Sequence, residues 1–127
     1  MTQVILVACG GALGAMARFL TVIGIQTLFR TPFPFGTLFV NGLGALLIGC
    51  IMALLLERMS FDAENWRMFM VVGFLGAYTT FSSFAWESLM LYQDGNPWGA
   101  LINFLSNNFL SLLGVVVGLK LGRLIGA

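Results

Sequence analysis

Four long runs of apolar residues, nearly free of charge, constrain the fold of this chain more than any other feature. The runs cover residues 4–29, 36–56, 66–92 and 98–124. Each is long enough to cross a bilayer, which takes about 20 residues of α-helix. Arg18 and Glu87 are the charges inside the runs, and the others lie at or near the ends. The pattern predicts an all-α membrane protein, with four transmembrane helices in a single domain over residues 1–127 and both chain ends on one side.

The scarcity of charge excludes most other classes of protein. Charged residues make up 9% of the chain, against roughly 25% in soluble domains, so a soluble fold could not cover its surface. The chain has no histidine and no basic cluster, which argues against a zinc site and against a nucleic-acid partner. Ser82 and Ser83 have no histidine base and no nearby lysine, so we do not expect an enzyme.

Small residues recur at every fourth position in three of the runs. They are Gly10 and Gly14; Asn41, Ala45, Gly49 and Ala53; and Gly114, Gly118, Gly122 and Gly126. A period of four lines one face of a helix, and small residues there let two backbones approach closely. We therefore expect these faces to form helix–helix contacts, within the chain or between chains. Because four thin helices enclose little space, we also expect two or more subunits to associate.

The third run carries the densest group of polar residues that the membrane must tolerate. Its glycines Gly73 and Gly76 precede two threonines and two serines within residues 79–83. Glycines and consecutive hydroxyl residues weaken a helix, so the sequence predicts an interruption between Gly76 and Thr80. Beyond it, helical spacing places Thr80, Ser83 and Glu87 on one face, and Phe81 and Phe84 form an adjacent stripe.

These side chains, together with Asn41 and Asn103 on other runs, indicate a site built from neutral hydrogen-bond donors. Hydroxyl and amide groups donate hydrogen bonds, and the positive edge of a phenyl ring can face an anion. Such a site suits a small anion that must pass without being trapped by a full charge. Other interpretations stay open, since the rings could be core aromatics, the asparagines could join helices, and Glu87 could pair with Arg18.

Three stretches of the chain resemble the Fluc/CrcB family of fluoride channels. They are residues 10–19 (GGALGAMARF), residues 36–41 (GTLFVN) followed by Gly44 and Gly49, and residues 73–84 followed by Glu87. The resemblance implies a fluoride-selective channel that exports fluoride ion from the cytoplasm by passive electrodiffusion. It also implies an antiparallel, dual-topology homodimer with two pores, embedded in the lipid bilayer of a bacterial plasma (inner) membrane, and a third helix that is broken near its middle.

The resemblance also implies roles for particular residues. The fluoride pore would be lined by Asn41, Thr80, Phe81, Ser82, Ser83, Phe84, Glu87 and Asn103. Phe81 and Phe84 would be rings contributed by the two subunits, and Asn41 would donate to fluoride near them. Arg18 would lie near a vestibule. A structural Na⁺ at the dimer centre would be held by the backbone carbonyls of Gly76 and Thr79 from both chains.

Two other functions fit parts of the pattern. A proton-coupled small multidrug-type cation antiporter is also a four-helix, dual-topology design, but it needs a titratable carboxylate deep in the membrane. The only intramembrane carboxylate here is Glu87, late in the third run. A non-transporting assembly subunit is a further alternative, because the glycine-rich faces alone would allow it.

Overall fold

The computed structural model of the protein describes residues 1–56 and 61–126. Its helical elements are α1 (Thr2–Phe29), α2 (Phe35–Leu56), α3 (Phe61–Trp66), the π-helix η1 (Arg67–Leu75), α4 (Gly76–Tyr78), α5 (Phe81–Gln93) and α6 (Pro97–Gly126). Four stretches are long and apolar enough to cross a membrane, namely Thr2–Phe29, Phe35–Leu56, Asp62–Gln93 and Pro97–Gly126. The prediction of an all-helical membrane protein with four spans is confirmed.

The predicted ends of the spans need one correction. The third run was expected to begin at residue 66, whereas the helix begins earlier, with α3 at Phe61. The acidic residues Asp62 and Glu64 lie in the first turn of α3, where they complement the positive end of the helix dipole. Residues 57–60 of the expected connection lie outside the described residues.

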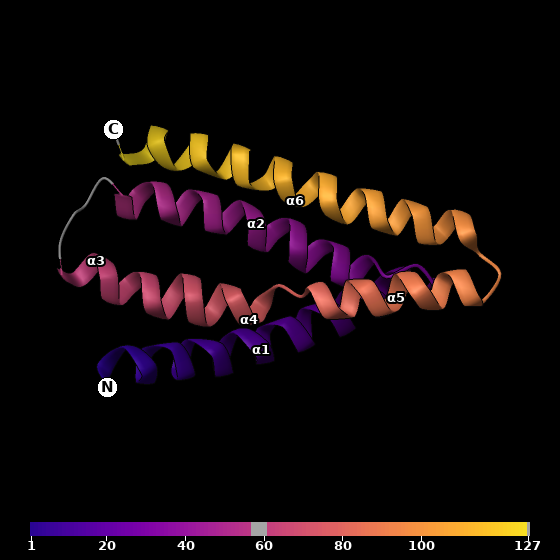
Figure 1. Ribbon diagram of the computed structural model, residues 1–127, viewed down its shortest axis with the longest axis horizontal. Helices are drawn as coiled ribbons and strands as arrows, with labels where there is room; N and C mark the ends of the chain where they lie inside the picture. The colour runs from indigo at the N-terminus through magenta and orange to yellow at the C-terminus, as the bar shows by residue number, and fades with distance from the viewer. Residues whose placement is uncertain (57–60, 127) are drawn as a thin grey trace.

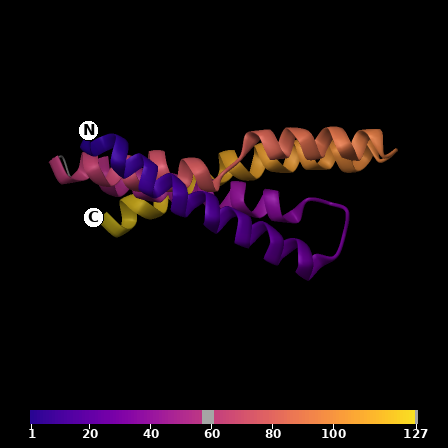
Figure 2. The same cartoon turned by 90° about the horizontal axis from the view of Figure 1, so that it is seen from below.

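Spans that follow one another in the chain run antiparallel. Across the view they lie in the order α6, α2, third span and α1, and both chain ends lie at the same end of the bundle (Figure 1). At the opposite end the bundle opens, because α1 and α2 diverge there from α5 and α6 (Figure 2). The outer faces of the helices carry many exposed apolar side chains, as expected for surfaces that contact lipid. Few side chains are buried between the described helices, so the polar ones among them determine which groups the interior can bind.

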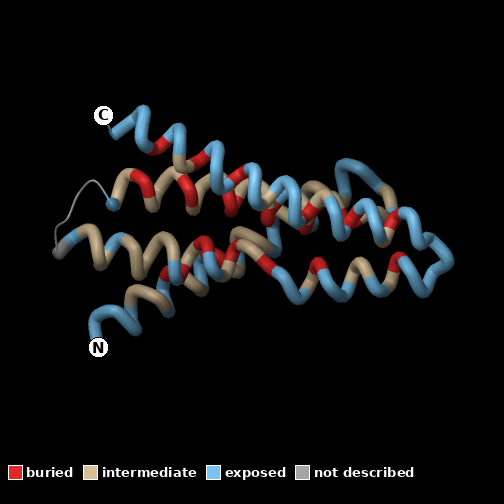
Figure 3. The backbone as a smooth tube through the Cα atoms, turned by 45° about the horizontal axis from the view of Figure 1, so that its top comes forward, coloured by how far each residue is buried: buried red, intermediate tan, exposed pale blue. Residues whose placement is uncertain are grey.

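The small-residue faces form helix–helix contacts within the chain, which is one of the two alternatives that the period of four left open. Buried positions line the facing sides of α2 and α6 (Figure 3). A methyl group added at Gly118 or Gly122 would collide with the backbone carbonyls of Leu46 or Cys50. One added at Gly14 would collide with the carbonyl of Phe74 in the third span. The predicted contact faces are therefore confirmed, apart from Gly126, which is exposed.

The third span differs from the other three in its backbone. It starts as α-helix, continues as π-helix over Arg67–Leu75, and returns to α-helix for the three residues Gly76–Tyr78. Thr79 (φ −85°, ψ 158°) and Thr80 (φ −152°, ψ 120°) are extended, and α5 begins at Phe81. The extended residues are the last two of the stretch for which the sequence predicted an interruption. No sequence pattern indicated the π-helix that precedes them.

Candidate functional site

The extended segment of the third span is held by one side chain from α2. The backbone N–H of Thr80 donates to Oδ1 of Asn41 at 2.8 Å, and Nδ2 of Asn41 donates to the Thr80 carbonyl at 3.0 Å. Both residues are buried. Backbone groups that leave a helix inside a bilayer need partners within the protein, since lipid offers none. Asn41 supplies both partners and so satisfies the Thr80 backbone on each side.

Thr80 also caps the half-helix that follows it. Its Oγ1 accepts the backbone N–H of Ser83 at 3.2 Å and donates to the Ser83 hydroxyl at 3.1 Å. Threonine at this position satisfies one of the N–H groups that a helix start leaves without a partner. The start of α5, which carries a partial positive charge from the helix dipole, therefore lies within the third membrane span.

The two phenylalanine rings are in contact but lie in different surroundings. Their centroids are 5.2 Å apart, with an edge-to-face angle of 70°. Phe84 is 3% exposed and packs on the ring of Phe104, with centroids 6.0 Å apart, whereas Phe81 is 75% exposed. Ser82, next to Phe81, is also exposed. The chain thus encloses one ring and leaves the other uncovered.

A cavity of about 510 Å³, here called the polar cavity, opens where α1 diverges from α5. Its lining includes Arg18, Thr37, Thr80, Ser83 and Glu87. Four of these five were predicted site residues, and the fold brings the five together from three spans. Thr37 was not predicted, although a hydroxyl residue in an otherwise apolar run is itself an indication of a polar site.

Glu87 in the polar cavity bonds to a hydroxyl rather than to a cation. Its Oε1 accepts the hydroxyl of Thr37 at 2.6 Å, and its Oε2 is buried without a hydrogen-bond partner among the described residues. Arg18 instead donates from Nη1 to the Thr79 carbonyl at 3.4 Å. Within residues 1–56 and 61–126, Arg18 and Glu87 form no ion pair, so the alternative that they pair with each other is not supported.

A second cavity of about 360 Å³, here called the ring cavity, lies on the other side of the extended segment. Its lining includes Asn41, Thr80, Phe81, Phe84 and Asn107. Thr80 lines both cavities. The extended segment of the third span therefore lies between the polar cavity and the ring cavity.

Asn103 is a predicted site residue that lines neither cavity. It is fully buried, donates from Nδ2 to the Ser88 hydroxyl at 2.9 Å, and accepts at Oδ1 from Nδ2 of Asn107 at 2.9 Å. Asn107 in turn accepts from Asn41 at 2.9 Å. Sequence reasoning did not place Asn107 in the site, although it lies four residues after Asn103 and so shares its face of the helix.

The backbone carbonyls of Gly76 and Thr79 lie at the end of α4, where helical bonding stops. The Thr80 N–H, which would bond the Gly76 carbonyl in a continued helix, donates to Asn41 instead. Thr79 itself is extended, and its carbonyl accepts a long hydrogen bond from Arg18 at 3.4 Å. Carbonyls of unwound helices are the groups that hold Na⁺ in membrane proteins, so their chemistry fits such an ion.

Residues 5–119 match the family model described as "CrcB-like protein, Camphor Resistance (CrcB)". This match covers most of the 127 residues. The chain belongs to the CrcB family.

Relatives within the CrcB family cover nearly the same length. A protein of Legionella pneumophila (strain Lens) named "Fluoride-specific ion channel FluC" is 48% identical over 112 residues, which are 88% of this chain and 83% of the relative. Proteins with the same name from Sulfurihydrogenibium sp. (strain YO3AOP1) and Shewanella amazonensis are 40% and 44% identical, and the matches cover 100% and 96% of those relatives.

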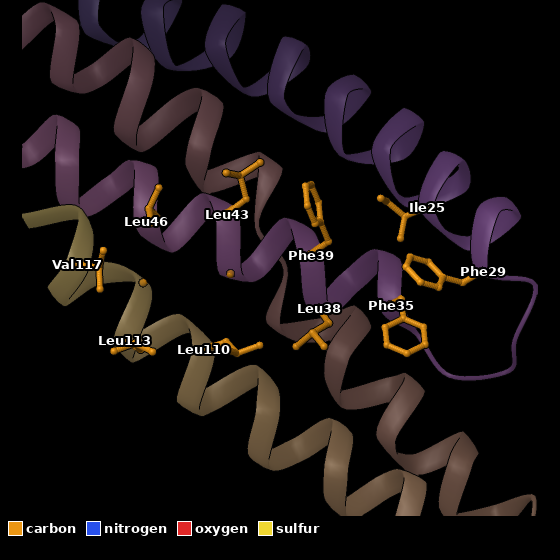
Figure 4. A pocket seen from close by; sticks show the side chains of 12 residues that line it. Ile25, Phe29, Phe35, Leu38, Phe39, Leu43, Leu46, Leu110, Leu113 and Val117 are labelled. Carbon is orange, nitrogen blue, oxygen red and sulfur yellow. The ribbon is translucent and has the colours of Figure 1, made fainter. Parts of the chain in front are cut away.

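This CrcB chain also has a large apolar groove, which contrasts with the two cavities at the interruption. The groove has a volume of about 530 Å³, and its lining consists of apolar side chains and glycines from α1, α2 and α6 (Figure 4). Phe29, Phe35 and Leu38 lie at one end of it, and Val117 lies at the other. No lining side chain can donate to an ion, so the groove is unsuited to conduct one.

Proposed function

We propose that this chain forms a fluoride-selective channel, which exports fluoride from the cytoplasm of a bacterium across its plasma membrane by passive electrodiffusion. The observation that carries the proposal is the identity of 40–48% to relatives named fluoride-specific ion channels, over nearly the whole chain. The neutral donors and phenyl rings beside the interrupted third span support it, because they are the groups such an ion needs.

The path that we propose runs through the polar cavity and the ring cavity, which share Thr80. The pore residues would be Asn41, Thr80, Phe81, Ser82, Ser83, Phe84, Glu87 and Asn103, with Arg18 near the vestibule. Ser83 lines the polar cavity, and its hydroxyl accepts from Thr80 at 3.1 Å, which leaves its own hydrogen to donate to an ion. Neutral donors and ring edges can replace part of the hydration of an anion without holding it.

The assembly that we propose is an antiparallel, dual-topology homodimer with two pores. The exposure of Phe81 supports it, because a ring that is 75% exposed beside the buried Phe84 leaves the ring pair open on one side. A second copy of the chain would cover that side, and each pore would then be flanked by rings of both subunits. In each subunit, the interrupted third span would line one pore.

The Na⁺ that we propose at the dimer centre would be bound by the Gly76 and Thr79 carbonyls of both chains. One chain supplies too few oxygens for a cation, so binding would depend on the second copy. The guanidinium of Arg18 contacts the Thr79 carbonyl at 3.4 Å, and a cation bound there would compete with it. The ion would join the two chains and hold the ends of the interrupted spans together.

The first test is fluoride efflux from liposomes that contain the purified protein, followed with a fluoride electrode. We expect flux well above that of empty liposomes and little chloride flux. No fluoride flux, or equal chloride flux, would overturn the proposal. Proton-driven cation uptake that is lost in Glu87→Gln would instead favour the antiporter, and a stable partner protein without any flux would favour the assembly subunit.

The second test uses the rings. We expect Phe81→Ile and Phe84→Ile each to reduce fluoride flux at least about tenfold, which corresponds to about 1.4 kcal/mol in the barrier, while the protein still assembles. Phe109→Ile is the matched control, because Phe109 is exposed on α6 and lines neither cavity. Unchanged flux in both ring variants would indicate that the two rings are core aromatics and do not line a pore.

A further inference from the structure

The large apolar groove of Figure 4 is a feature that the proposed ion path does not use. Its floor lies where α2 meets α6, because Gly42 and Gly114 line it and a methyl group added at Gly114 would lie 3.0 Å from the Gly42 carbonyl oxygen. Its walls are aliphatic and phenylalanine side chains of α1, α2 and α6. No polar side chain of the described residues lines it, so it suits an apolar occupant.

The groove and the ring cavity lie on opposite faces of the α2–α6 pair. On α6, Val117 lines the groove and Val115 lines the ring cavity. On α2, Leu46 and Ile48 differ in the same way. Each pair is two positions apart, which turns an α-helix by about 200°. Phe81, whose exposure supports the proposed second copy, lines the ring cavity, so the groove faces away from that copy and is open to lipid.

The groove is about as long as one leaflet of a bilayer. It begins at Phe29 and Phe35, the last residue of α1 and the first of α2, and reaches Leu46 and Val117 at its other end (Figure 4). From Phe35 to Leu46 the helix rises about 16 Å, and half of the hydrocarbon core is about 15 Å. A further transmembrane helix would need contacts along the whole span, so this length fits the acyl chain of a lipid rather than a helix.

A positive charge lies where the groove meets the membrane surface. Arg30 follows Phe29 directly, caps the C-terminus of α1 and is exposed. Among the described residues it has no acidic partner. Asp94, in the other connection at this end, joins α5 to α6, which diverge there from α1 and α2 (Figure 2). A guanidinium can bind a phosphate through two parallel hydrogen bonds, so Arg30 complements an anionic lipid headgroup.

We propose that the groove binds one acyl chain of an anionic phospholipid and that Arg30 binds the phosphate of the same lipid. The acyl chain would enter between Phe29 and Phe35 and lie over Gly42 and Gly114, where it fills the space that the two glycines leave. Close packing rather than removal from water would hold it, because the surrounding lipid is equally apolar. The proposal does not depend on the proposed fluoride channel, since lipid binding is measured without fluoride.

The decisive substitution is Gly42→Leu, which fills the floor of the groove. Outside its own helix, a Cβ at residue 42 comes no closer than 4.0 Å to another atom, the Cβ of Leu110, so the packing of α2 on α6 should survive. Gly24→Leu is the matched control, because a Cβ there meets no atom within 4 Å and Gly24 does not line the groove. Arg30→Gln removes the charge at the exposed end of the groove, and Arg30→Lys retains it.

The first measurement is native mass spectrometry of the purified protein, titrated with palmitoyl-oleoyl phosphatidylglycerol or with the matching phosphatidylcholine. We expect one phosphatidylglycerol to be retained per chain, with about fivefold weaker binding of phosphatidylcholine, the size associated with one basic residue near an anionic lipid. Gly42→Leu should weaken binding of both lipids at least about tenfold, whereas Gly24→Leu should stay within about twofold of the wild type. Equal binding of phosphatidylglycerol to the wild type and to Gly42→Leu would overturn the proposal.

The charge variants separate the headgroup from the acyl chain. Arg30→Gln should bind the two lipids equally, and Arg30→Lys should retain most of the preference for phosphatidylglycerol. A preference that depends on Arg30 while Gly42→Leu has no effect would overturn the proposal, because it would show that the headgroup alone is bound.

The second measurement locates the acyl chain. Phosphatidylglycerol with a diazirine near the end of one acyl chain is bound to the protein and illuminated, and the crosslinked peptides are identified. We expect crosslinks at the deep end of the groove, within residues 43–46 and 110–117, and their loss in Gly42→Leu. Crosslinks spread evenly over all the lipid-facing helices would overturn the proposal. A changed oligomeric state of Gly42→Leu without any retained lipid in the wild type would also overturn it, because a second copy would then fill the groove.

Discussion

The two halves of the third span are held in place by opposite means. In η1 and α4, the third span presses its backbone against α1, and Gly10, Gly14 and Gly73 leave no room for a side chain at the contact. In α5, polar side chains join the span to α2 and α6, and cavities lie on either side. Because its backbone packs closely, the first half cannot accept larger side chains at the contact. The second half depends instead on the direction of a few hydrogen bonds. The proposed ion path belongs to the second half.

The largest effect should come from adding volume to the first half. A methyl group at Gly14 would overlap the backbone carbonyl of Phe74, and a backbone inside two packed helices cannot move aside as a side chain can. We expect Gly14→Ala to lower the free energy of unfolding by about 1–3 kcal/mol or more. The measurement is the midpoint of thermal unfolding of the purified protein in detergent.

The matched control for this substitution lies on the same helix. A methyl group at Gly24 meets no atom within 4 Å, so Gly24→Ala should be neutral or stabilise α1 by roughly 0.5–1 kcal/mol through lower backbone entropy. Equal stability of the two alanine variants would show that the first half does not depend on close backbone approach.

The next effect should come from removing a hydrogen bond in the second half. Thr37 is buried and donates to Glu87 at 2.6 Å. Thr37→Val keeps the shape and removes the donor, so both oxygens of Glu87 would lack a partner, at a cost of about 1–3 kcal/mol. Thr27→Val is the control, because within the described part of the chain the exposed Thr27 hydroxyl bonds to the carbonyl of Ile23 on its own helix. Equal loss of thermal stability in the two variants would contradict the role of this contact.

The sequence predicted the spans and the close helix contacts because both depend on local pattern. A run of about 20 apolar residues is a span wherever it occurs, and a period of four places Gly118 and Gly122 on one face. The π-helix over Arg67–Leu75 could not be predicted in this way, since no residue in RMFMVVGFL requires it. It lies where Gly10 and Gly14 on another helix let α1 approach closely, and a local pattern does not reveal such a tertiary contact.

The candidate site was predicted in its residues but not in its connections. Helical spacing placed Thr80, Ser83 and Glu87 on one face, and the three residues line one cavity. The partner of the Thr80 backbone is 39 residues away, on α2, and no periodicity reveals such a pairing. The sequence left open whether Asn41 lines a pore or joins helices, and the fold shows that it joins α2 to the third span and to α6.

A smaller effect in the second half should come from the cap of α5. Thr80→Val removes the oxygen that accepts the Ser83 N–H at 3.2 Å but keeps the backbone bonds of Thr80 to Asn41. We expect a loss of about 1 kcal/mol, typical of a missing helix cap, measured as a lower midpoint of thermal unfolding. Thr80→Ser keeps the hydroxyl and should restore most of the stability. A valine variant as stable as the wild type would show that the cap does not hold α5.

The smallest effect should come from the charged pair where the first half begins. Arg67 and Glu64 lie 2.8 Å apart, one turn from each other, and both side chains are more than a third exposed. Exposed pairs gain little because water and salt screen them and because two long side chains must be ordered. We expect Glu64→Gln to leave the midpoint of thermal unfolding unchanged at low and at high salt. A loss as large as that of Gly14→Ala, which disappears at high salt, would mean that charge pairing rather than close backbone packing holds the first half of the span against α1.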